Sequence, residues 1–361
     1  MSDTSPTTHG APRSTTERRP ADARGSRPRS RRRTTASAIL LAVSTLFISL
    51  LAGCGSTEAK SLLDSIRSGE VVLGTKFDQP GLGIYNPDKT MSGFDPAVSE
   101  YVVNHIADSL GVAHPKISWR ETPSARREAM IEHGEVDMIA ATYSINENRA
   151  KKVDFGGPYL ITYQGLMVRK SDDSIHNLPD LGNGKKLCSV TGSTSAQNVK
   201  AQLPNIELQE YDSYSACVEA LRRGKVDALT TDESILAGYS NFWKGEFRLV
   251  EMTYLKDACV KKALKSAGTP FSTERYGIGL AKGDTASVDK VNEALDSMLK
   301  PGPGNGPSPW ITALRDNLGD DYVNQISQRA QTPDSKFTFT PKPGDLAFLE
   351  SKSTPCPPGL K

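Results

Sequence analysis

Residues 116–141 read KISWRETPSARREAMIEHGEVDMIAA, and their apolar residues change spacing twice. The pattern predicts a strand over 116–120, a helix over 124–132 and a second strand over 136–141. Units of this kind place parallel strands side by side with a helix against them. Upstream, a predicted strand at 69–77 and a predicted helix at 95–110 continue the alternation. We therefore expect an α/β fold with largely parallel sheets.

A second set of elements repeats this order further along the chain. It comprises a strand, two helices and a strand, at 184–192, 193–203, 213–224 and 225–232. Residues 134–137 (GEVD) are echoed by residues 224–227 (GKVD), each after a predicted helix and before a predicted strand. This echo favours two similar lobes over one long sheet. A strand and two helices follow, at 276–281, 288–299 and 310–318, and the proline- and lysine-rich chain after Thr332 predicts extended surface structure.

The first 53 residues have the character of an export signal. Residues 1–35 hold nine arginines and three acidic residues, and residues 36–52 read ASAILLAVSTLFISLLA without a charge. This apolar run is at the lower limit for a spanning helix, and its basic flank favours a signal peptide. The ending Leu51-Ala52-Gly53-Cys54 resembles a bacterial lipobox, which implies that Cys54 carries a lipid anchor. The alternatives are an ordinary transmembrane anchor and, more weakly, twin-arginine export.

Charge and composition exclude several classes of function for residues 54–361, here called the body. Residues 1–53, here called the leader, contribute +6 to the net charge of +2, so residues 54–361 carry −4. A mildly acidic body with 24% charged residues excludes a basic nucleic-acid binder, a collagen and wholesale disorder. No second apolar run of 18 residues occurs. We expect a bacterial protein held on the outer face of the cell membrane.

Four cysteines remain after Cys54 is set aside. An even number in an exported chain predicts two disulfides, although four cysteines allow three connectivities. Cys188 lies in a predicted strand and Cys217 in a predicted helix, which makes that pair a plausible staple. Cys259 and Cys356 would then pin the tail. A zinc site is the alternative, and no paired ligand spacing supports it.

Several separated motifs resemble one family. They are Gly93-Phe94-Asp95, residues 134–137, Ser144-Ile145-Asn146-Glu147-Asn148-Arg149, residues 153–159, Gly192-Ser193-Thr194, residues 226–232 and Tyr276-Gly277-Ile278. In this order, over about residues 68–320, they resemble the extracellular solute-binding proteins (family 3) of polar amino-acid ABC importers. The likeness is closest to the glutamate/aspartate-binding lipoproteins.

The resemblance implies a two-lobed, type II periplasmic-binding-protein fold. In that fold two mostly parallel sheets are joined by two hinge strands, and the ligand lies between the lobes. The chain then divides into a signal peptide (1–53), a tether (54–67), a first lobe in two segments (68–162 and 273–330), a second lobe (163–272) and a C-terminal tail (331–361). The resemblance also implies an ABC permease as partner and no cofactor or metal.

Candidate ligand-binding residues follow from matching the family motifs. Arg149 would bind the ligand α-carboxylate with a planar guanidinium, assisted by Ser144 and Thr142. In the other lobe Asp232 would accept the ligand ammonium. A solvated helix-end charge is the alternative for Arg149, and a helix cap is the alternative for Asp232.

The segment Gly192, Ser193 and Thr194 follows a predicted strand and opens a helix. Its backbone N–H groups and the helix dipole would suit a carboxylate. A plain serine or threonine cap is the alternative.

Specificity depends on Lys76, Ser124 and Arg127, which match a basic residue, a serine and an arginine of the glutamate/aspartate binders. A second carboxylate enclosed in a cleft requires a second cation, because an unpaired buried charge is costly. These residues therefore favour L-glutamate or L-aspartate over glutamine. The alternative leaves both cations on the surface.

Three other functions remain open from sequence. The same body could report amino-acid levels to a membrane sensor. It could be an enzyme on this fold, such as a dehydratase or a peptidoglycan-cleaving enzyme, but the body has no nucleophile or metalloprotease motif and its histidines fall outside the candidate site. An adhesive lipoprotein would not need two hinged lobes. We expect a binding protein rather than an enzyme.

Overall fold

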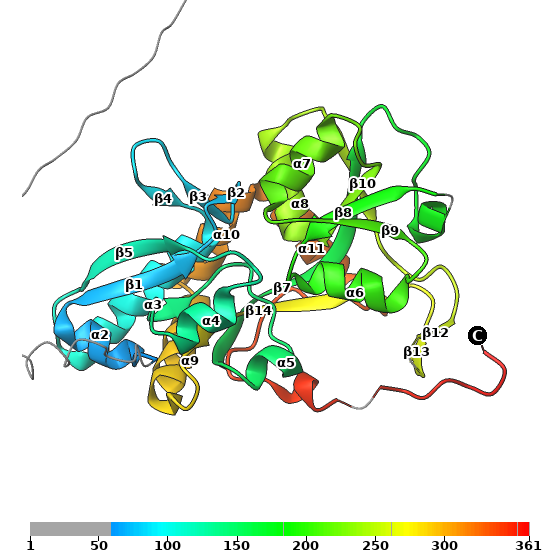
Figure 1. The fold of residues 1–361 in the computed structure, drawn as a ribbon. Coiled ribbons are helices and arrows are strands. Elements are labelled where there is room, and N and C mark those ends of the chain that lie inside the picture. The colour runs from blue at the N-terminus through cyan, green and yellow to red at the C-terminus, as the bar shows by residue number, and fades with distance from the viewer. Residues whose placement is uncertain (1–58, 183, 261, 352, 361) are drawn as a thin grey trace, which may run out of the picture. The chain divides into compact units, whose positions relative to one another are not determined.

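The computed structural model describes residues 59–182, 184–260, 262–351 and 353–360, and a nine-stranded sheet runs through this part (Figure 1). Eight strands form one path, and β11 (Phe247–Glu251) pairs with β7 beside it. The path runs through β5 (Lys116–Glu121), β1 (Glu70–Thr75), β6 (Met138–Ile139), β14 (Thr273–Leu280), β7 (Asp154–Arg169), β10 (Ala228–Asp232), β8 (Lys186–Val190) and β9 (Glu207–Tyr211).

Two long strands join the halves of this sheet. The first part of β7 pairs antiparallel with β14, and its last part, from Gln164 on, pairs antiparallel with β10 and β11. On either side the strands run parallel: β5, β1 and β6 in one half, and β10, β8 and β9 in the other. We call these halves, with their helices, the first and the second lobe, and β7 and β14 the hinge strands. The two predicted, mostly parallel sheets are present, and they share β7.

Helices cover both lobes (Figure 1). The first lobe carries α2 (Leu62–Ser68), α3 (Phe94–Leu110), α4 (Arg127–Glu132), α5 (Glu147–Ala150), α9 (Thr285–Leu299) and α10 (Pro309–Leu318). The second lobe carries α6 (Thr194–Gln202), α7 (Tyr214–Arg222) and α8 (Glu233–Phe242). Short elements complete the structure: β2 (Asp78–Gln79), β3 (Gly83–Tyr85), β4 (Met91–Ser92), β12 (Ala258–Val260), β13 (Ala263–Lys265) and the 3-10 turns Leu178–Gly182, Pro303–Asn305 and Ala347–Leu349.

Two boundaries differ from the expected ones. Helix α2 begins inside the segment 54–67 expected as a tether and ends at Ser68, and its Leu62 and Ile66 are fully buried in the first-lobe core. Helix α11 (Asp320–Gln331) was not predicted, and the segment up to residue 330 that contains most of it was expected in the first lobe. Its Arg329 instead forms a two-pronged ion pair with Glu233 of α8, with an Nη1–Oε1 distance of 3.0 Å. The helix therefore links the first-lobe segment to the second lobe.

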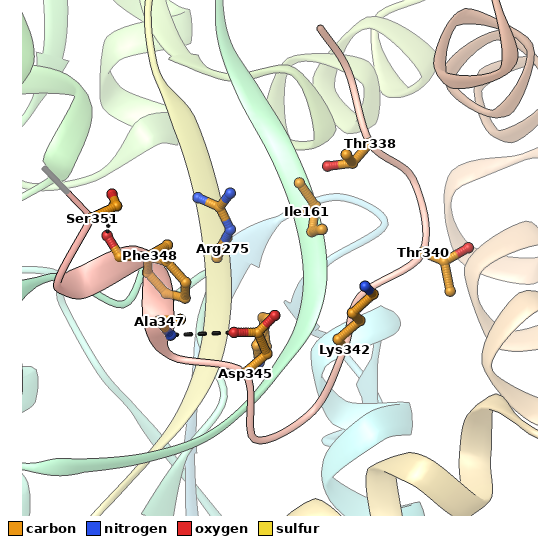
Figure 2. A pocket seen from close by; sticks show the side chains of 10 residues that line it. Ile161, Arg275, Thr338, Thr340, Lys342, Asp345, Ala347, Phe348 and Ser351 are labelled. Atoms are coloured by element: carbon orange, nitrogen blue, oxygen red, sulfur yellow. Dashed lines mark hydrogen bonds between the residues drawn. The ribbon is translucent and has the colours of Figure 1, made fainter. Parts of the chain in front are cut away.

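The two predicted disulfides are confirmed. Cys188 of β8 pairs with Cys217 of α7, inside the second lobe. Cys259 of β12 pairs with Cys356, 97 residues further along the chain. The tail after Thr332 is largely without regular structure, as expected, and lies against the hinge strands (Figure 2).

The leader and Cys54 lie outside the described residues. Within the described ranges no helix has both the length and the apolar character needed to cross a bilayer. Export and lipid anchoring therefore stay predictions.

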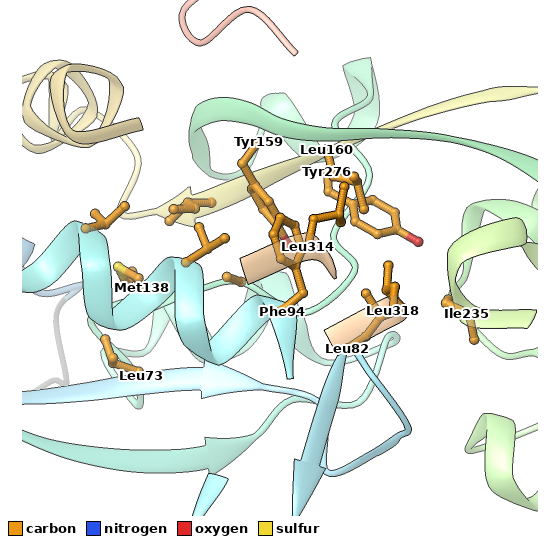
Figure 3. Packing of buried hydrophobic residues seen from close by; sticks show 14 of the residues in the cluster. Leu73, Leu82, Phe94, Met138, Tyr159, Leu160, Ile235, Tyr276, Leu314 and Leu318 are labelled. Carbon is orange, nitrogen blue, oxygen red and sulfur yellow. The ribbon is translucent and has the colours of Figure 1, made fainter. Parts of the chain in front are cut away.

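The first-lobe core anchors the hinge strands. Phe94 of α3 is fully buried, and its ring centroid lies 6.0 Å from that of Tyr159 in β7 and 6.5 Å from that of Trp310 in α10. Figure 3 shows Leu314 of α10 beside this group, together with Tyr276 of β14. Large aromatic rings packed in this way contribute strongly to core stability. The core therefore holds fixed the strand ends that carry the candidate site.

Candidate functional site

Lys76, Ser124 and Arg127 meet in the first lobe. Lys76 follows β1, Ser124 precedes α4 and Arg127 opens α4. The Lys76 ammonium donates to Ser124 Oγ at 3.0 Å, and Arg127 Nη1 donates to the carbonyl oxygens of Ala141 and Thr142 at 2.9 and 3.2 Å. Each of the three predicted side chains is at most 5% exposed. The two cations are therefore buried and are not surface charges.

These two cations have only neutral hydrogen-bond partners. Among the described residues neither Lys76 nor Arg127 forms an ion pair with a carboxylate. Burial, with Arg127 nearby, lowers the pKa of Lys76 to about 7. Burial, with Arg149 nearby, lowers the pKa of Arg127 to about 10. Because an uncompensated buried charge is costly, this part of the site is suited to an incoming anion.

Arg149 lies where the two lobes meet. Asn146 caps the short helix α5 by accepting the Arg149 N–H at 3.0 Å, which fixes where the side chain starts. Arg149 Nη1 donates to the Ser144 carbonyl at 2.7 Å, and Arg149 Nη2 donates to the Gly192 carbonyl of the second lobe at 2.9 Å. Its Nε lies 3.2 Å from a Glu128 carboxylate oxygen, and the side chain is 6% exposed. The solvated helix-end alternative is therefore wrong.

The backbone turn at Thr142 connects this cluster to a buried carboxylate. Thr142 has a φ of 47°, in the left-handed region that side chains disfavour. Its N–H donates to Asp95 Oδ2 at 2.8 Å, and the Tyr159 hydroxyl donates to Asp95 Oδ1 at 2.7 Å. Asp95 lies in the first turn of α3, which begins at Phe94, and its carboxylate turns into the core instead of capping the helix. Burial raises the pKa of Asp95 to about 6.

Tyr143 forms a floor beneath both guanidinium groups. The carbon at the centre of the Arg127 guanidinium lies 4.3 Å from the ring centroid, and that of Arg149 lies 5.1 Å from it. A cation over an aromatic face is attracted to the ring's negative quadrupole. Tyr143 therefore holds two cations of like charge close together.

In the second lobe, Gly192, Ser193 and Thr194 form the turn before α6. Gly192 has a φ of 77°, and a Cβ there would lie 2.6 Å from the Ala125 Cα of the first lobe, so the close approach requires glycine. The Ser193 side chain accepts a hydrogen bond from the first turn of α6, as the capping alternative expected. The Thr194 hydroxyl lies 3.3 Å from that of Ser144 across the lobes.

Asp232 ends β10 and is 3% exposed. It accepts the Tyr276 hydroxyl at 2.6 Å and the Ser195 hydroxyl at 3.3 Å, and it makes no capping bond to α8. The helix-cap alternative is therefore wrong. Burial, with Glu274 nearby, raises the pKa of Asp232 to about 8. A cation arriving beside it would favour the ionised carboxylate.

The predicted residues thus gather where the lobes face each other. Six come from the first lobe and four from the second: Lys76, Ser124, Arg127, Thr142, Ser144, Arg149, Gly192, Ser193, Thr194 and Asp232. A cavity of about 360 Å³ borders this set and is lined in part by Ser124, Arg149 and Gly192.

Sequence reasoning missed several residues that support the site. Asp95 and Tyr276 stood within motifs that had been singled out, but their hydrogen-bond partners lie far along the chain. No pattern pointed to Glu128 or Ser195.

Comparison with known proteins places the chain in a family. The family model of bacterial extracellular solute-binding proteins, family 3, matches residues 71–303. This chain belongs to that family. It is 51% identical over 301 residues to the glutamate-binding protein GluB of Corynebacterium efficiens, over 83% of this chain and 92% of that protein. It is 33% identical over 274 residues to the ABC transporter glutamine-binding protein GlnH of Bacillus subtilis, over 73% of this chain and 92% of that protein.

A solved structure agrees with this placement. An ancestral arginine-binding protein bound to glutamine is 28% identical, with a TM-score of 0.56, and the match covers 70% of this chain and 99% of that one. The two-lobed type II fold expected from sequence is therefore confirmed. The family acts outside the cytoplasm, and this chain is a solute-binding protein rather than an enzyme.

Proposed function

We propose that this protein is a lipid-anchored receptor that binds L-glutamate or L-aspartate outside the cell membrane and delivers it to the permease of an ABC importer. The observation that carries the proposal is the buried pair Lys76 and Arg127, whose partners in the described structure are all neutral. A ligand side-chain carboxylate would supply the charge that compensates them. The 51% identity to a glutamate-binding protein supports the same ligand class.

The remaining groups suit the amino-acid backbone of such a ligand. Arg149 is the cation for the α-carboxylate, since its guanidinium already bonds to carbonyl oxygens of both lobes and can exchange them for a carboxylate. Asp232 is the acceptor for the ammonium. One ligand would then be bound from both lobes at once.

Binding from both lobes gives the ligand its effect on conformation. Contacts to Arg149 in the first lobe and to Asp232 in the second are made together only when the lobes are closed. A ligand shifts a conformational equilibrium by its difference in affinity for the two states. The bound ligand therefore stabilises the closed receptor, which is the form offered to the permease.

The acidic side chain distinguishes this proposal from a glutamine receptor. A neutral amide can accept hydrogen bonds from Lys76 and Arg127, but it does not supply the negative charge that stabilises the charged forms of both side chains. A site built for a charged group rejects the isosteric neutral analogue by a large factor. The glutamine-binding relative, at 33% identity, makes glutamine the competitor to test.

A thermal-shift screen with the twenty amino acids tests the ligand class. A ligand that binds only the folded protein raises the melting temperature by mass action. We expect the largest shifts with L-glutamate and L-aspartate and small ones with their amides. A larger shift with glutamine, arginine or cystine than with either acid would contradict the proposal.

Anchoring and transport need separate tests. Metabolic labelling with radioactive palmitate is expected to mark the full chain and not its Cys54→Ser variant. Deleting the gene is expected to abolish high-affinity uptake of radiolabelled glutamate by the cells. Unchanged uptake would exclude the importer role and favour a receptor that signals to a membrane sensor.

A further inference from the structure

The C-terminal residues 332–351 and 353–360, here called the strap, cross both hinge strands on the surface of the protein (Figure 2). None of the ligand-binding residues proposed above belongs to the strap. The helix before it, α11, is held on the second lobe by the ion pair between Arg329 and Glu233. The strap therefore starts from the second lobe.

The strap first contacts hinge strand β7. The Tyr163 hydroxyl donates to the Thr338 carbonyl at 3.0 Å and accepts the Thr338 N–H. The Phe337 ring packs edge-on against Tyr163, with centroids 4.7 Å apart, and Arg329 lies 4.0 Å above Phe337. Tyr163 ends the part of β7 that pairs with β14, and Gln164 begins the part that pairs with β10. The contact is therefore at the point where β7 passes from one lobe to the other.

The middle of the strap is attached to the first lobe. The Phe339 ring packs against Trp310 of α10, with centroids 5.2 Å apart. The Gly344 N–H donates to the Gly157 carbonyl, near the first-lobe end of β7, at 2.8 Å. Leu346 and its neighbours Phe348 and Leu349 pack on the first-lobe cluster around Tyr143 and Ile145.

The strap then crosses hinge strand β14 and returns to the second lobe. Phe348 lies under the Arg275 guanidinium of β14, 4.4 Å from ring centroid to guanidinium carbon. Beyond it the Thr354 carbonyl accepts the Leu264 N–H of β13 at 2.8 Å. The disulfide between Cys356 and Cys259 attaches this end of the strap covalently to β12 of the second lobe. Ala258 and Val260, which flank that cysteine, pack on the second-lobe core.

The strap thus has both ends on the second lobe and its middle on the first. Between the strap and the hinge strands is a cavity of about 510 Å³, so the attachment rests on a few contacts rather than on continuous packing (Figure 2). In this structure the lobes are in contact with each other: Arg149 donates to the Gly192 carbonyl, and the Tyr239 hydroxyl donates to the Asp78 carbonyl. Because the middle of the strap is bonded to the first lobe and its ends to the second, a rotation that separates the lobes strains or breaks some of these contacts.

We propose that the strap is a hinge restraint that favours the closed arrangement of the lobes. The disulfide makes the restraint effective, because it prevents the far end of the strap from leaving together with the middle. The restraint does not depend on which ligand binds. It sets how far the ligand-free receptor opens and how fast a bound ligand escapes.

The test compares variants of the chain 56–361, which forms one compact unit with its own cores. Cys259→Ser with Cys356→Ser frees the end of the strap, and Tyr163→Phe removes only the hydroxyl bonded to Thr338. The matched controls are Cys188→Ser with Cys217→Ser, a disulfide within the second lobe, and Tyr211→Phe, a hydroxyl bonded to Gln209 away from the hinge strands. Small-angle scattering gives the radius of gyration without ligand, and stopped-flow fluorescence gives the glutamate dissociation rate.

We expect both strap variants to have a larger ligand-free radius of gyration and a dissociation rate raised about tenfold, the scale of one hydrogen-bonded aromatic contact. The controls should match the unmodified chain. Equal radii and equal dissociation rates in Tyr163→Phe and the unmodified chain would overturn the proposal, even if the cysteine variant failed to fold. The dissociation rate rests on the proposed ligand, whereas the radius does not. Failure to bind glutamate would therefore leave the scattering result to decide.

Discussion

Replacing Lys76 with methionine tests how the site recognises an acidic side chain. Methionine keeps the buried apolar stem and removes an ammonium whose acceptor in the described structure is Ser124 Oγ. Truncating one member of a buried charge pair costs about 2–5 kcal/mol of binding free energy. Glutamate affinity should therefore fall at least about 30-fold. Glutamine affinity should fall by less than about fivefold, because only a neutral hydrogen bond is lost.

The same substitution changes the protons exchanged on binding. Burial lowers the pKa of Lys76 to about 7, so the ligand-free protein holds this amine mostly neutral at pH 8. A ligand carboxylate restores the ammonium form, and glutamate binding then takes up a proton. Asp232, with its pKa raised to about 8, releases protons when the ligand ammonium arrives, in variant and parent alike. At pH 8 the parent should take up about one proton more per glutamate than Lys76→Met.

Calorimetric titrations in two buffers of different ionisation enthalpy measure this proton number. Lys300→Met, at an exposed lysine after α9, is the matched control.

The folded-state pKa of Lys76 lies below its usual value of 10.5, so the unfolded chain binds the proton more tightly. The unfolding free energy of the ligand-free parent should therefore rise with pH between about 7 and 10.5, and Lys76→Met should lack that rise. Equal proton numbers and equal glutamate-to-glutamine affinity ratios in parent and variant would refute the reasoning.

Three further substitutions probe other parts of the site. Arg149→Ala should weaken titrated binding of glutamate and glutamine alike at least about 30-fold, whereas Arg315→Ala, at a surface ion pair, should not; near-parental affinity would remove Arg149 from the site. Gly192→Ala places a Cβ against Ala125 and should reduce glutamate affinity about tenfold by opposing closure; an unchanged dissociation constant would contradict this. Asp95→Asn has only one side-chain oxygen to accept from the Thr142 N–H and the Tyr159 hydroxyl, so it should lower the free energy of unfolding in urea by about 1–3 kcal/mol. An unchanged free energy of unfolding would contradict this.

The sequence predicted the fold class well where its periodicity was clear. Residues 116–141 formed the expected strand, helix and strand, with only the boundaries shifted. The long hinge strand β7 was not recognised because almost all of its residues are buried, so it shows no alternation, and its glycines and proline are typical of a turn. Helix α11 was missed because its sequence is mostly polar, with Val323 and Ile326 as its buried residues.

The candidate site followed the motifs as far as residue placement goes. Lys76, Arg127 and Arg149 are buried and near one another, as the motif matching predicted. Asp95 and Asp232 each lie at the start of a helix, yet neither carboxylate caps it, because tertiary hydrogen bonds compete with capping. Asp95 is bound by Thr142, 47 residues away, and such a pairing has no signature in local sequence.

The strap could be predicted only in part. Cysteine counting indicated that Cys356 fastens the tail, and the structure confirms the pair with Cys259. The contacts of Phe337 and Phe348 with the hinge strands depend on the path of the tail over the folded body. A segment without helical or strand periodicity gives no sequence signal for that path.

The central claim is that buried, uncompensated cations select an acidic amino acid. Calorimetric titration of the chain 56–361 with L-glutamate and with L-glutamine at pH 7 tests it most directly. We predict that glutamate binds at least about 30-fold more tightly, which corresponds to about 2 kcal/mol. Glutamine binding as tightly as glutamate, or more tightly, would contradict the account.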